Sequence, residues 1–480
     1  MQIIENYING QLVAPRAGNY LDNVEPATGQ VYSQIPNSCQ QDLEFAVTAA
    51  QQAQYSWANT SLEKRAAILC RLADLIDANA EDLARAEAID NGKPIAFARK
   101  VDIYRSSANI RFFAHAGTQF SSESHAMENI AINYTLRDPI GIVGCISPWN
   151  FPLYLFTWKI APALATGNVV IAKPSEVTPM TAYLFSKLCI EAGLPAGVLN
   201  ILHGSGASIG GPITTHPKIK AISFTGGSAT GAHITQATAG MFKKLSLELG
   251  GKNPTLVFAD CDFEETVKEV VRAAFSNQGQ ICLCGSRIYI ERPIYEQFKQ
   301  AFVELVEKLK IGDPLDEQTQ HGALVSEAHM NKVLSYIELA KQEGGTILTG
   351  GKRHQLDGRC ANGFFVEPTV IEGLTNQCRT NQEEIFGPVC SIMPFDDEQQ
   401  ALELANGTQY GLASSVWTND LKRAHRVAKQ IEAGIVWINC WLLRDLRTPF
   451  GGVKSSGVGR EGGLEAMRFF TEPKNVCIKY

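Results

Sequence analysis

The first third of the chain has hydrophobic residues at helical spacing. Apolar side chains recur every three or four positions between Gln41 and Asn91, which is the period of an amphipathic helix. The clearest members of the series are Ala66, Leu69, Leu72, Leu75 and Ile76. This region therefore predicts helices that cover a sheet with their apolar faces.

From Ile142 onward, short apolar runs alternate with helical segments. A first series consists of Ile142–Ile146, Val169–Ala172, Val198–Leu202, Ala221–Phe224 and Leu245–Leu249. A second series follows Gly250-Gly251 and consists of Thr255–Phe258, Ile288–Ile290, Val389–Pro394, Ser414–Trp417 and Ile435–Ile438, with helical segments such as Glu264–Asn277 between them. This alternation is typical of parallel α/β sheets, and two series predict two α/β lobes.

Two further segments have the alternation of strands but interrupt this order. They are Ile130–Leu136 and the C-terminal Asn475–Tyr480, and we expect them to form an exposed ribbon that pairs with another subunit. The longest irregular stretch is Arg444–Gly463, which is rich in glycine, serine and charge. Loops of this length are often functional, although a simple surface crossover would have the same composition.

Composition excludes several classes of protein. The 480 residues are 45% apolar and 19% charged, which suits two or more folded domains. A net charge of −6 without runs of lysine or arginine gives no basis for binding nucleic acid or an acidic membrane. The N-terminus has no signal-peptide pattern, and no apolar stretch reaches the ~20 residues of a membrane span. These features predict a cytoplasmic location.

The cysteines also narrow the possibilities. Twelve of them are spread from Cys39 to Cys477 without paired spacing, a pattern that favours reduced thiols over a disulfide framework. Cys282 and Cys284 are close enough to suggest a metal, but no second cysteine pair or His-x-His motif supplies further ligands. We therefore expect no metal site.

One cysteine has the surroundings of a reactive thiol. The segment Phe275–Arg287 places Cys282 among small and amide residues just before a predicted strand. A thiol attacks only as its thiolate, and Gly279 and Gly285 let backbone N–H groups come close to it. Cys282 is the candidate nucleophile. The alternative is that Cys282 and Cys284 are two small hydrophobic residues at the start of a strand.

Two polar residues follow or end predicted strands. Glu248 is the one carboxylate of an apolar run that ends at a double glycine, where burial would raise its pKa and suit it to general-base chemistry. A buried structural ion pair would explain it equally well. Asn150 follows the run that ends at Ile146, so it either donates to a developing oxyanion or caps the helix from Leu153.

A nucleotide site is predicted at a third strand end. The segment from Phe224 to Gly231 contains Thr-Gly-Gly between a strand and a helix, and free N–H groups at a helix N-terminus bind pyrophosphate. The segment from Gly204 to Gly210 approaches the usual dinucleotide fingerprint but has the wrong spacing.

Together these motifs resemble the aldehyde dehydrogenase family. The resemblance rests on Cys282 after Gly-Gln, Glu248 in Leu-Glu-Leu-Gly-Gly-Lys, Asn150 in Ser-Pro-Trp-Asn-Phe-Pro, the loop after Phe224 and Glu384-Ile-Phe-Gly-Pro. It implies an α/β fold with a Rossmann-type cofactor domain, an α/β catalytic domain and a β-ribbon for oligomerisation. The implied ranges are 1–119 and 140–250 for the cofactor domain, 251–455 for the catalytic domain, and 120–139 and 470–480 for the ribbon.

The resemblance also implies roles for individual residues. Cys282 would be the nucleophile, Glu248 the general base and Asn150 the oxyanion donor, with a thioester as intermediate. The cofactor would be NAD, since a carboxylate at Glu176 repels the 2′-phosphate of NADP. The residues that would bind the cofactor are Ile146, Ser147, Pro148, Trp149, Lys173, Ser175, Glu176, Gly206, Gly210, Phe224, Thr225, Gly226, Gly227, Leu249, Gly250, Glu384 and Phe386. A homodimer or homotetramer is the expected assembly.

The expected substrate is a small anionic aldehyde. By the same resemblance, Arg105, Trp158, Arg444 and Phe450 would line the substrate mouth, and two guanidinium groups there would bind a carboxylate. Ordinary surface salt bridges are the alternative role for the arginines. The segments around Cys282 and Arg444 resemble a subgroup that oxidises 2-aminomuconic and 2-hydroxymuconic 6-semialdehydes, which would place the reaction in kynurenine or related aromatic degradation. A broader aldehyde specificity stays open.

Two other classes remain possible from the sequence. A cysteine hydrolase or acyltransferase would share the nucleophile but requires a base such as histidine, and none of the nine histidines lies in the motif segments. A non-catalytic relative would keep the fold but would not need Cys282, Glu248 and Asn150 together.

Overall fold

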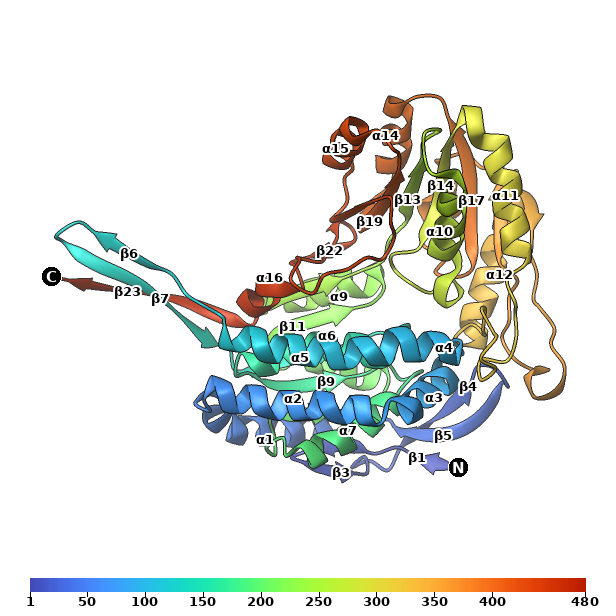
Figure 1. Cartoon of the computed structure of the whole chain (residues 1–480). Coiled ribbons are helices and arrows are strands. Elements are labelled where there is room, and N and C mark those ends of the chain that lie inside the picture. The colour runs from blue at the N-terminus through green and yellow to red at the C-terminus, as the bar shows by residue number, and fades with distance from the viewer.

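Two lobes and a projecting ribbon make up the molecule (Figure 1). The structure is a computed structural model that describes all 480 residues. Each lobe is built on a mostly parallel sheet with helices packed against it, and the largest hydrophobic core lies in the lobe that contains residues 40–250. The two predicted α/β lobes are confirmed.

The first lobe contains an eight-stranded sheet. In spatial order its strands are β22 (Gly457–Val458), β12 (Lys244–Glu248), β11 (Ile219–Thr225), β8 (Ile142–Ile146), β9 (Val169–Lys173), β10 (Leu199–Ile201), β2 (Asn6–Ile8) and β3 (Gln11–Val13). All five runs of the first predicted series are strands of this sheet, and they are parallel to one another. Strands β22, β2 and β3 join the ends of this parallel series by antiparallel pairing, and the alternating pattern did not predict them.

The helices of the first lobe pack in layers. They are α1 (Gln40–Ala58), α2 (Leu62–Ala78), α3 (Ala80–Asn91), α4 (Ile95–Phe97), the π-helix η1 (Ala98–Ile103), α5 (Tyr104–Thr118), α6 (Pro152–Ala165), α7 (Met180–Ala192), η2 (Gly206–Gly210), α8 (Gly211–Thr215), α9 (Ser228–Thr238) and η3 (Ala239–Met241). Helix α1 packs on β8 and β9 as predicted, whereas α2 packs on α5, α6 and α7. The prediction that all the early helices cover a sheet was wrong for α2, because α6 already lies on β8 and β9.

The second lobe contains a seven-stranded sheet. In spatial order its strands are β15 (Thr346–Thr349), β16 (Thr369–Glu372), β17 (Val389–Phe395), β14 (Gly285–Glu291), β13 (Asn253–Val257), β19 (Ala413–Trp417) and β20 (Ile435–Ile438). Every run of the second predicted series is one of these strands. Its helices are α10 (Phe263–Phe275), η4 (Ser276–Gly279), η5 (Arg292–Ile294), α11 (Tyr295–Glu307), α12 (Glu327–Gln342), η6 (Gly358–Cys360), α13 (Arg379–Gln382), α14 (Glu398–Asn406) and α15 (Leu421–Gln430). The last helix of the chain, α16 (Gly463–Phe469), returns to the first lobe and packs on α5 and α6. No helix of the protein combines the length and apolar character needed to span a membrane.

Small sheets complete the body. Strands β1 (Gln2–Ile3), β4 (Tyr20–Glu25) and β5 (Gln30–Pro36) form one sheet, and β18 (Tyr410–Gly411) pairs with β21 (Val453–Lys454). Strands β21 and β22 lie within the stretch from Arg444 to Gly463 that the sequence suggested to be irregular. The rest of the stretch is irregular as expected, and the two short strands form because it crosses between the lobes and pairs with a strand of each.

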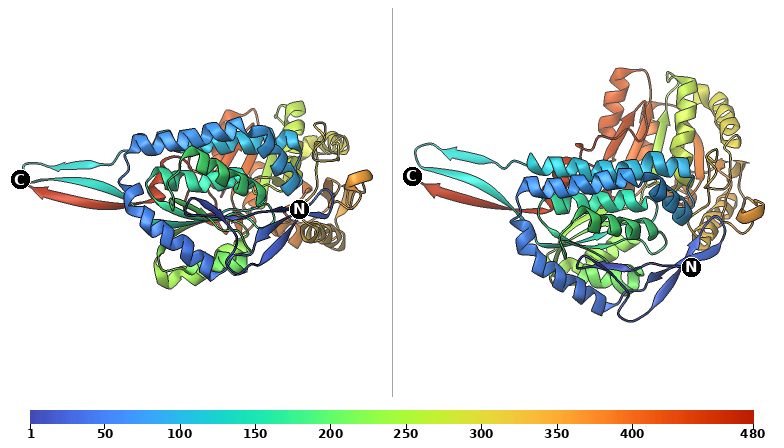
Figure 2. Two further views of the ribbon diagram at one scale, coloured as in Figure 1. Left: turned by 90° about the horizontal axis from the view of Figure 1, so that it is seen from below. Right: turned by 60° about the horizontal axis from the view of Figure 1, so that its bottom comes forward.

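A three-stranded ribbon projects from the first lobe and carries the C-terminus at its tip in every view (Figures 1 and 2). It consists of β6 (Ser124–Met127), β7 (Ala131–Pro139) and β23 (Thr471–Lys479), with β7 in the centre. Both segments predicted to form the ribbon are strands in it. Its exposed large apolar side chains include Met127, Leu136, Ile478 and Tyr480.

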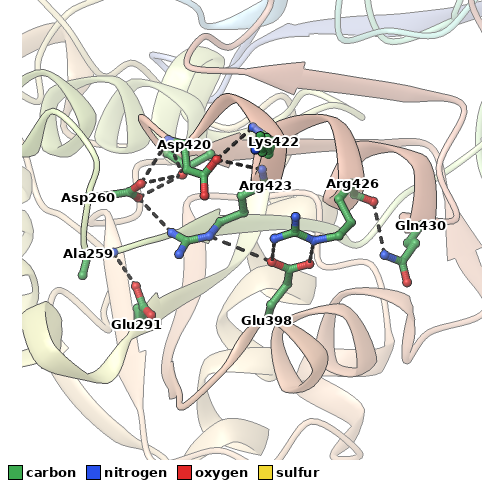
Figure 3. A network of polar contacts seen from close by, with 10 residues as sticks. Ala259, Asp260, Glu291, Glu398, Asp420, Lys422, Arg423, Arg426 and Gln430 are labelled. Atoms are coloured by element: carbon green, nitrogen blue, oxygen red, sulfur yellow. Dashed lines mark hydrogen bonds and ion pairs between the residues drawn. The ribbon is translucent and has the colours of Figure 1, made fainter.

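An ion-pair network fixes helix α15 on the second lobe (Figure 3). Arg423 lies between Asp260 and Glu398, donating to Asp260 Oδ1 over 3.0 Å, and Arg426 pairs with Glu398 over 2.6 Å. Exposed pairs of this kind contribute only about 0–1 kcal/mol each. The network therefore orients the helix more than it stabilises the fold.

Candidate active site

A cleft opens at the carboxyl ends of the strands of the first sheet. Its outer part has a volume of about 720 Å³ and its inner part about 250 Å³, and the two share lining residues such as Trp149 and Gly226. Parallel α/β sheets place their ligand sites at this edge. Every residue predicted to bind the cofactor lines one of the two parts, and Cys282 and Asn150 line the inner one.

The outer cleft suits a nucleotide phosphate. Helix α9 begins after Gly227, and no side chain caps its first N–H groups, so they remain available to an anion. A Cβ atom at Gly226 would come within 2.4 Å of the Phe224 ring, which explains the glycine. The hydroxyls of Ser147 and Thr225 are buried without a hydrogen-bond partner, as expected where a ligand supplies the partner.

The other end of the outer cleft contains a lysine–glutamate pair. Lys173 Nζ lies 2.9 Å from Glu176 Oε2, and the N–H of Gly206 donates to Glu176 Oε1 over 3.4 Å. Burial opposes ionisation of Glu176, but Lys173 and these hydrogen bonds outweigh it and hold the pKa of Glu176 below its ordinary value. An ionised carboxylate here can accept hydrogen bonds from ribose hydroxyls.

The inner cleft is closed by aromatic and acidic side chains. Phe386 lies edge-on to Trp149 with 5.2 Å between ring centroids, and its carbonyl is 2.7 Å from His329 Nε2. Glu384 Oε1 accepts from the N–H of Gly251 over 2.8 Å. His329 lies on α12, far in sequence from every motif, so nothing in the sequence pointed to it.

Cys282 sits on a tightly constrained turn. Gln278 and Gly279 precede it with φ angles of 56° and 68°, and a Cβ atom at Gly279 would lie 2.1 Å from the carbonyl oxygen of Gly387. The side chain of Asn253 donates to the carbonyl of Cys282 over 2.7 Å. Only glycine fits such a left-handed, crowded position, so the chain places the thiol on a rigid support.

The surroundings of Cys282 favour the thiol over the thiolate. Burial raises the pKa of Cys282, and the carboxylates of Glu384 and Glu248 raise it further, while Arg444 opposes them. The sequence suggested that backbone N–H groups would favour the thiolate, but burial is the stronger effect. A base is therefore needed to take the proton.

Asn150 does not cap a helix. Helix α6 has Phe151 at its N-cap, without a side-chain capping bond, so that alternative was wrong. The Asn150 amide instead donates to the carbonyl of Gln280, two residues before Cys282, over 3.0 Å. This bond uses one of its two N–H groups, and the second is free to stabilise negative charge beside the thiol.

Glu248 is a buried carboxylate without an ion-pair partner. It ends β12 with 4% of its surface exposed, and neither carboxylate oxygen has a hydrogen-bond partner. The alternative of a structural ion pair was wrong, because Lys159 instead pairs with Glu461 over 2.7 Å. Burial, followed by the charge of Glu461, raises the pKa of Glu248 well above its ordinary range. Such a group is a competent general base near neutral pH.

Two arginines meet around a tyrosine on α6. Arg444 Nη1 donates to the hydroxyl of Tyr154 over 2.9 Å, and the Arg105 guanidinium lies 5.2 Å from the centre of the same ring. The Nε atom of Arg105 is buried without a partner. Neither arginine has a carboxylate within ion-pair distance, so the salt-bridge alternative was wrong.

The aromatic residues predicted at the mouth support Arg444. Its guanidinium lies 3.9 Å from the centre of the Phe450 ring and 5.2 Å from that of Trp158, and both rings are almost fully buried. The sequence missed Tyr154. The signal was its spacing of four residues from Trp158, which puts both on one face of α6.

Comparison with known proteins agrees with this site. The model of the "Aldehyde dehydrogenase family" matches residues 13–476. The 2-aminomuconic semialdehyde dehydrogenase of Mus musculus is 48% identical over 100% of this chain and 98% of its own length. The 2-hydroxymuconic semialdehyde dehydrogenase of Pseudomonas sp. (strain CF600) is 46% identical over 100% of both chains.

Solved structures agree as well. The NAD+ complex of aldehyde dehydrogenase from Bacillus cereus superposes with a TM-score of 0.97 at 40% identity, and the match covers 100% of this chain and 97% of that one. Sequence, site geometry and fold therefore lead to one conclusion, which is that the chain belongs to the aldehyde dehydrogenase family.

Proposed function

We propose that the protein oxidises 2-aminomuconic 6-semialdehyde to 2-aminomuconate with NAD as hydride acceptor. This proposal rests on the guanidinium groups of Arg105 and Arg444 around Tyr154, neither of which pairs with a carboxylate. Arg444 is close enough to Cys282 for its charge to lower the pKa of the thiol. Two arginines without carboxylate partners favour an anionic substrate. Relatives named for 2-aminomuconic semialdehyde support the choice.

The 2-hydroxy analogue is the alternative substrate, and a relative named for it is nearly as similar. The arginines would hold the carboxylate of either compound, since the two differ only by an amino or hydroxyl group. A broader specificity for aldehydes is the third possibility.

The first half of the proposed mechanism forms a bond to sulfur. Glu248 takes the proton of the Cys282 thiol, and the sulfur attacks the aldehyde carbon. The carbonyl oxygen becomes an oxyanion, which the free N–H of Asn150 and the backbone N–H of Cys282 stabilise. NAD, held in the cleft by residues such as Lys173, Glu176 and Glu384, would supply the hydride acceptor that converts this adduct to a thioester.

The second half releases the acid. Glu248 first releases the thiol proton to bulk water and is ionised again. It then takes a proton from a water molecule, and the resulting hydroxide attacks the thioester carbon. The carbon–sulfur bond breaks, Cys282 leaves as the thiolate, and the carboxylic acid departs. Glu248 precedes Leu249, which lines the inner part of the cleft, and neither of its carboxylate oxygens has a hydrogen-bond partner. Both observations support this double use.

We also propose that the ribbon mediates assembly into a homodimer or homotetramer. Every residue of strand β6 is exposed, and the ribbon carries exposed apolar side chains such as Ile478. Exposed strand edges of this kind pair with another chain. We further propose that the ribbon, residues 120–139 and 470–480, is distinct from a cofactor domain of residues 1–119 and 140–250 and from a catalytic domain of residues 251–455. Strand β22 pairs with β12, so residues 457–458 lie in the sheet of the cofactor domain.

Replacing Arg444 with Ala is expected to raise the KM for 2-aminomuconic 6-semialdehyde by about 10- to 100-fold, because a hydrogen bond to a charged group contributes about 1.5–3 kcal/mol. The kcat should change little if the contact binds ground state and transition state equally. The measurement is NADH formation on the 2-amino and 2-hydroxy substrates beside hexanal, whose KM should not rise.

The matched control is Arg447→Ala. Arg447 lies in the same segment, but its guanidinium is exposed and pairs with Asp445. Its KM values should equal those of the wild type. An unchanged KM for Arg444→Ala, or better use of hexanal than of the muconic substrates by the wild type, would exclude the anionic substrate while keeping the dehydrogenase.

Replacing Glu176 with Gln is expected to relax the preference for NAD over NADP. The ionised carboxylate repels a 2′-phosphate, and its removal should lower the ratio of kcat/KM for NAD to that for NADP by about tenfold or more. Steady-state rates with each cofactor at saturating aldehyde measure the ratio. A wild type that uses both cofactors equally would contradict the assignment.

A further inference from the structure

Three ionisable side chains lie fully buried close to Asn150. They are Glu87 on α3, Lys93 after α3 and Asp102 in the π-helix η1, each with 0% of its surface exposed. Lys93 Nζ donates to Asp102 Oδ1 over 2.6 Å and to the backbone carbonyl of Asn150 over 2.8 Å. None of the three lines the cleft. Since burying each ion costs several kcal/mol, the cluster requires an explanation other than packing.

The same cluster holds the backbone on both sides of that asparagine. Asn91, at the end of α3, donates from its side chain to the carbonyl of Trp149 over 2.8 Å. Glu87 Oε1 accepts from the N–H of Leu153 at the start of α6 over 3.4 Å. Trp149 and Leu153 flank the turn that carries Asn150. Hydrogen bonds therefore hold the backbone of this turn before, at and after Asn150.

The charges within the cluster balance. Glu87 Oε2 and Asp102 Oδ2 are both buried without a donor, and one proton shared between them satisfies both. Burial and the neighbouring Asp102 raise the pKa of Glu87 well above its usual range. Burial also raises the pKa of Asp102, although the charge of Lys93 opposes this shift. Asp102 forms the ion pair with Lys93, and the raised pKa of Glu87 favours its neutral form, so no unpaired charge remains.

We propose that Lys93, held by its ion pair with Asp102, is a positioning residue that fixes Asn150 so that its free amide N–H points at the developing oxyanion. The inference rests on the proposed role of Asn150 in catalysis. The Asn150 carbonyl also accepts from Asn277 over 3.0 Å, but Asn277 lies in the segment that supports the nucleophile. Lys93 therefore ties the oxyanion donor to the first lobe independently of the cysteine turn.

The test is a double-mutant cycle on the full-length enzyme. The double variant K93M/D102N removes the donor and its counter-ion together, so that no buried charge is left alone. We expect its single-turnover rate of NADH formation to fall by about 10²-fold, the cost of displacing a reacting group by about 1 Å, while NAD binding is unchanged. In the Asn150→Ala background, the same two substitutions should cause no further loss, because groups that act through one another are not additive.

The outcomes separate this inference from the proposed function. A wild-type rate for Asn150→Ala would refute the role of Asn150 in the proposed mechanism. Two results would overturn only the positioning role, provided that Asn150→Ala itself is impaired. In the first, K93M/D102N reacts at the wild-type rate. In the second, K93M/D102N lowers the rate of the Asn150→Ala enzyme by the same factor as it lowers that of the wild type. A control of similar stability loss, Phe298→Leu in the core of the second lobe, should leave the single-turnover rate unchanged.

A second variant covers failure to fold. If K93M/D102N gives no folded protein, Asn91→Ala breaks the neighbouring anchor on the carbonyl of Trp149 without unpairing a charge, and it enters the same cycle. Its rate loss should again vanish in the Asn150→Ala background. Full additivity would reject the proposal.

Discussion

Replacing Cys282 with Ala is expected to abolish aldehyde oxidation, with a loss of about 10⁴- to 10⁶-fold in kcat, because a covalent mechanism has no route around its nucleophile. The thiol lines the inner cleft beside Asn150, and no other cysteine lines either part of the cleft. NADH formation on 2-aminomuconic 6-semialdehyde measures the loss. NAD binding, measured by the quenching of protein fluorescence, should persist because the substitution leaves the outer part of the cleft unchanged.

Cys284→Ala is the matched control for this experiment. Cys284 is buried two residues away, and its thiol contacts the carbonyl of Ser276 over 3.9 Å rather than the cleft. We expect it to retain nearly full activity. Substantial turnover by Cys282→Ala, or equal inactivation by both variants, would mean that Cys282 is not the attacking group.

Hydrophobic patterning predicted the central part of each sheet and little of the edges. The runs from Ile142 and from Thr255 are buried on both faces, so each is continuously apolar and stands out from its surroundings. Strands such as β3 and β15 are short and partly exposed. Their pairing is decided by the neighbouring strand rather than by local sequence, so it could not be read from the chain.

Some residues of the active site were likewise predictable from the sequence, and others were not. Residues at strand ends, such as Glu248 and Lys173, were predictable because strand order brings carboxyl ends to one edge. His329 and Tyr154 lie on helices outside the motifs and reach the site only through tertiary packing. The raised pKa of Cys282 was also beyond the sequence, because it depends on the burial of the thiol and on the nearby charges of Glu384 and Glu248.

Glu248→Gln is expected to lower kcat by about 10²- to 10⁴-fold, the usual contribution of a general base, and to leave a thioester on Cys282. The first turnover should still release up to one NADH per active site, although more slowly because the thiol has lost its base, and hydrolysis should then limit the rate. Intact-protein mass spectrometry of the quenched enzyme should detect the added acyl group. The double variant E248Q/C282A should show no such adduct.

The pH dependence of kcat provides an independent test of Glu248. Burial and Glu461 raise the pKa of Glu248 well above its ordinary range, and only the ionised form accepts a proton. The wild-type kcat should therefore fall as the pH drops through this raised pKa, well above the ~4.3 of a free glutamate. Gln does not titrate, so the variant should lose this limb of the profile. If the variant keeps the same limb, or turns over at the wild-type rate, then another group is the base that releases the acid.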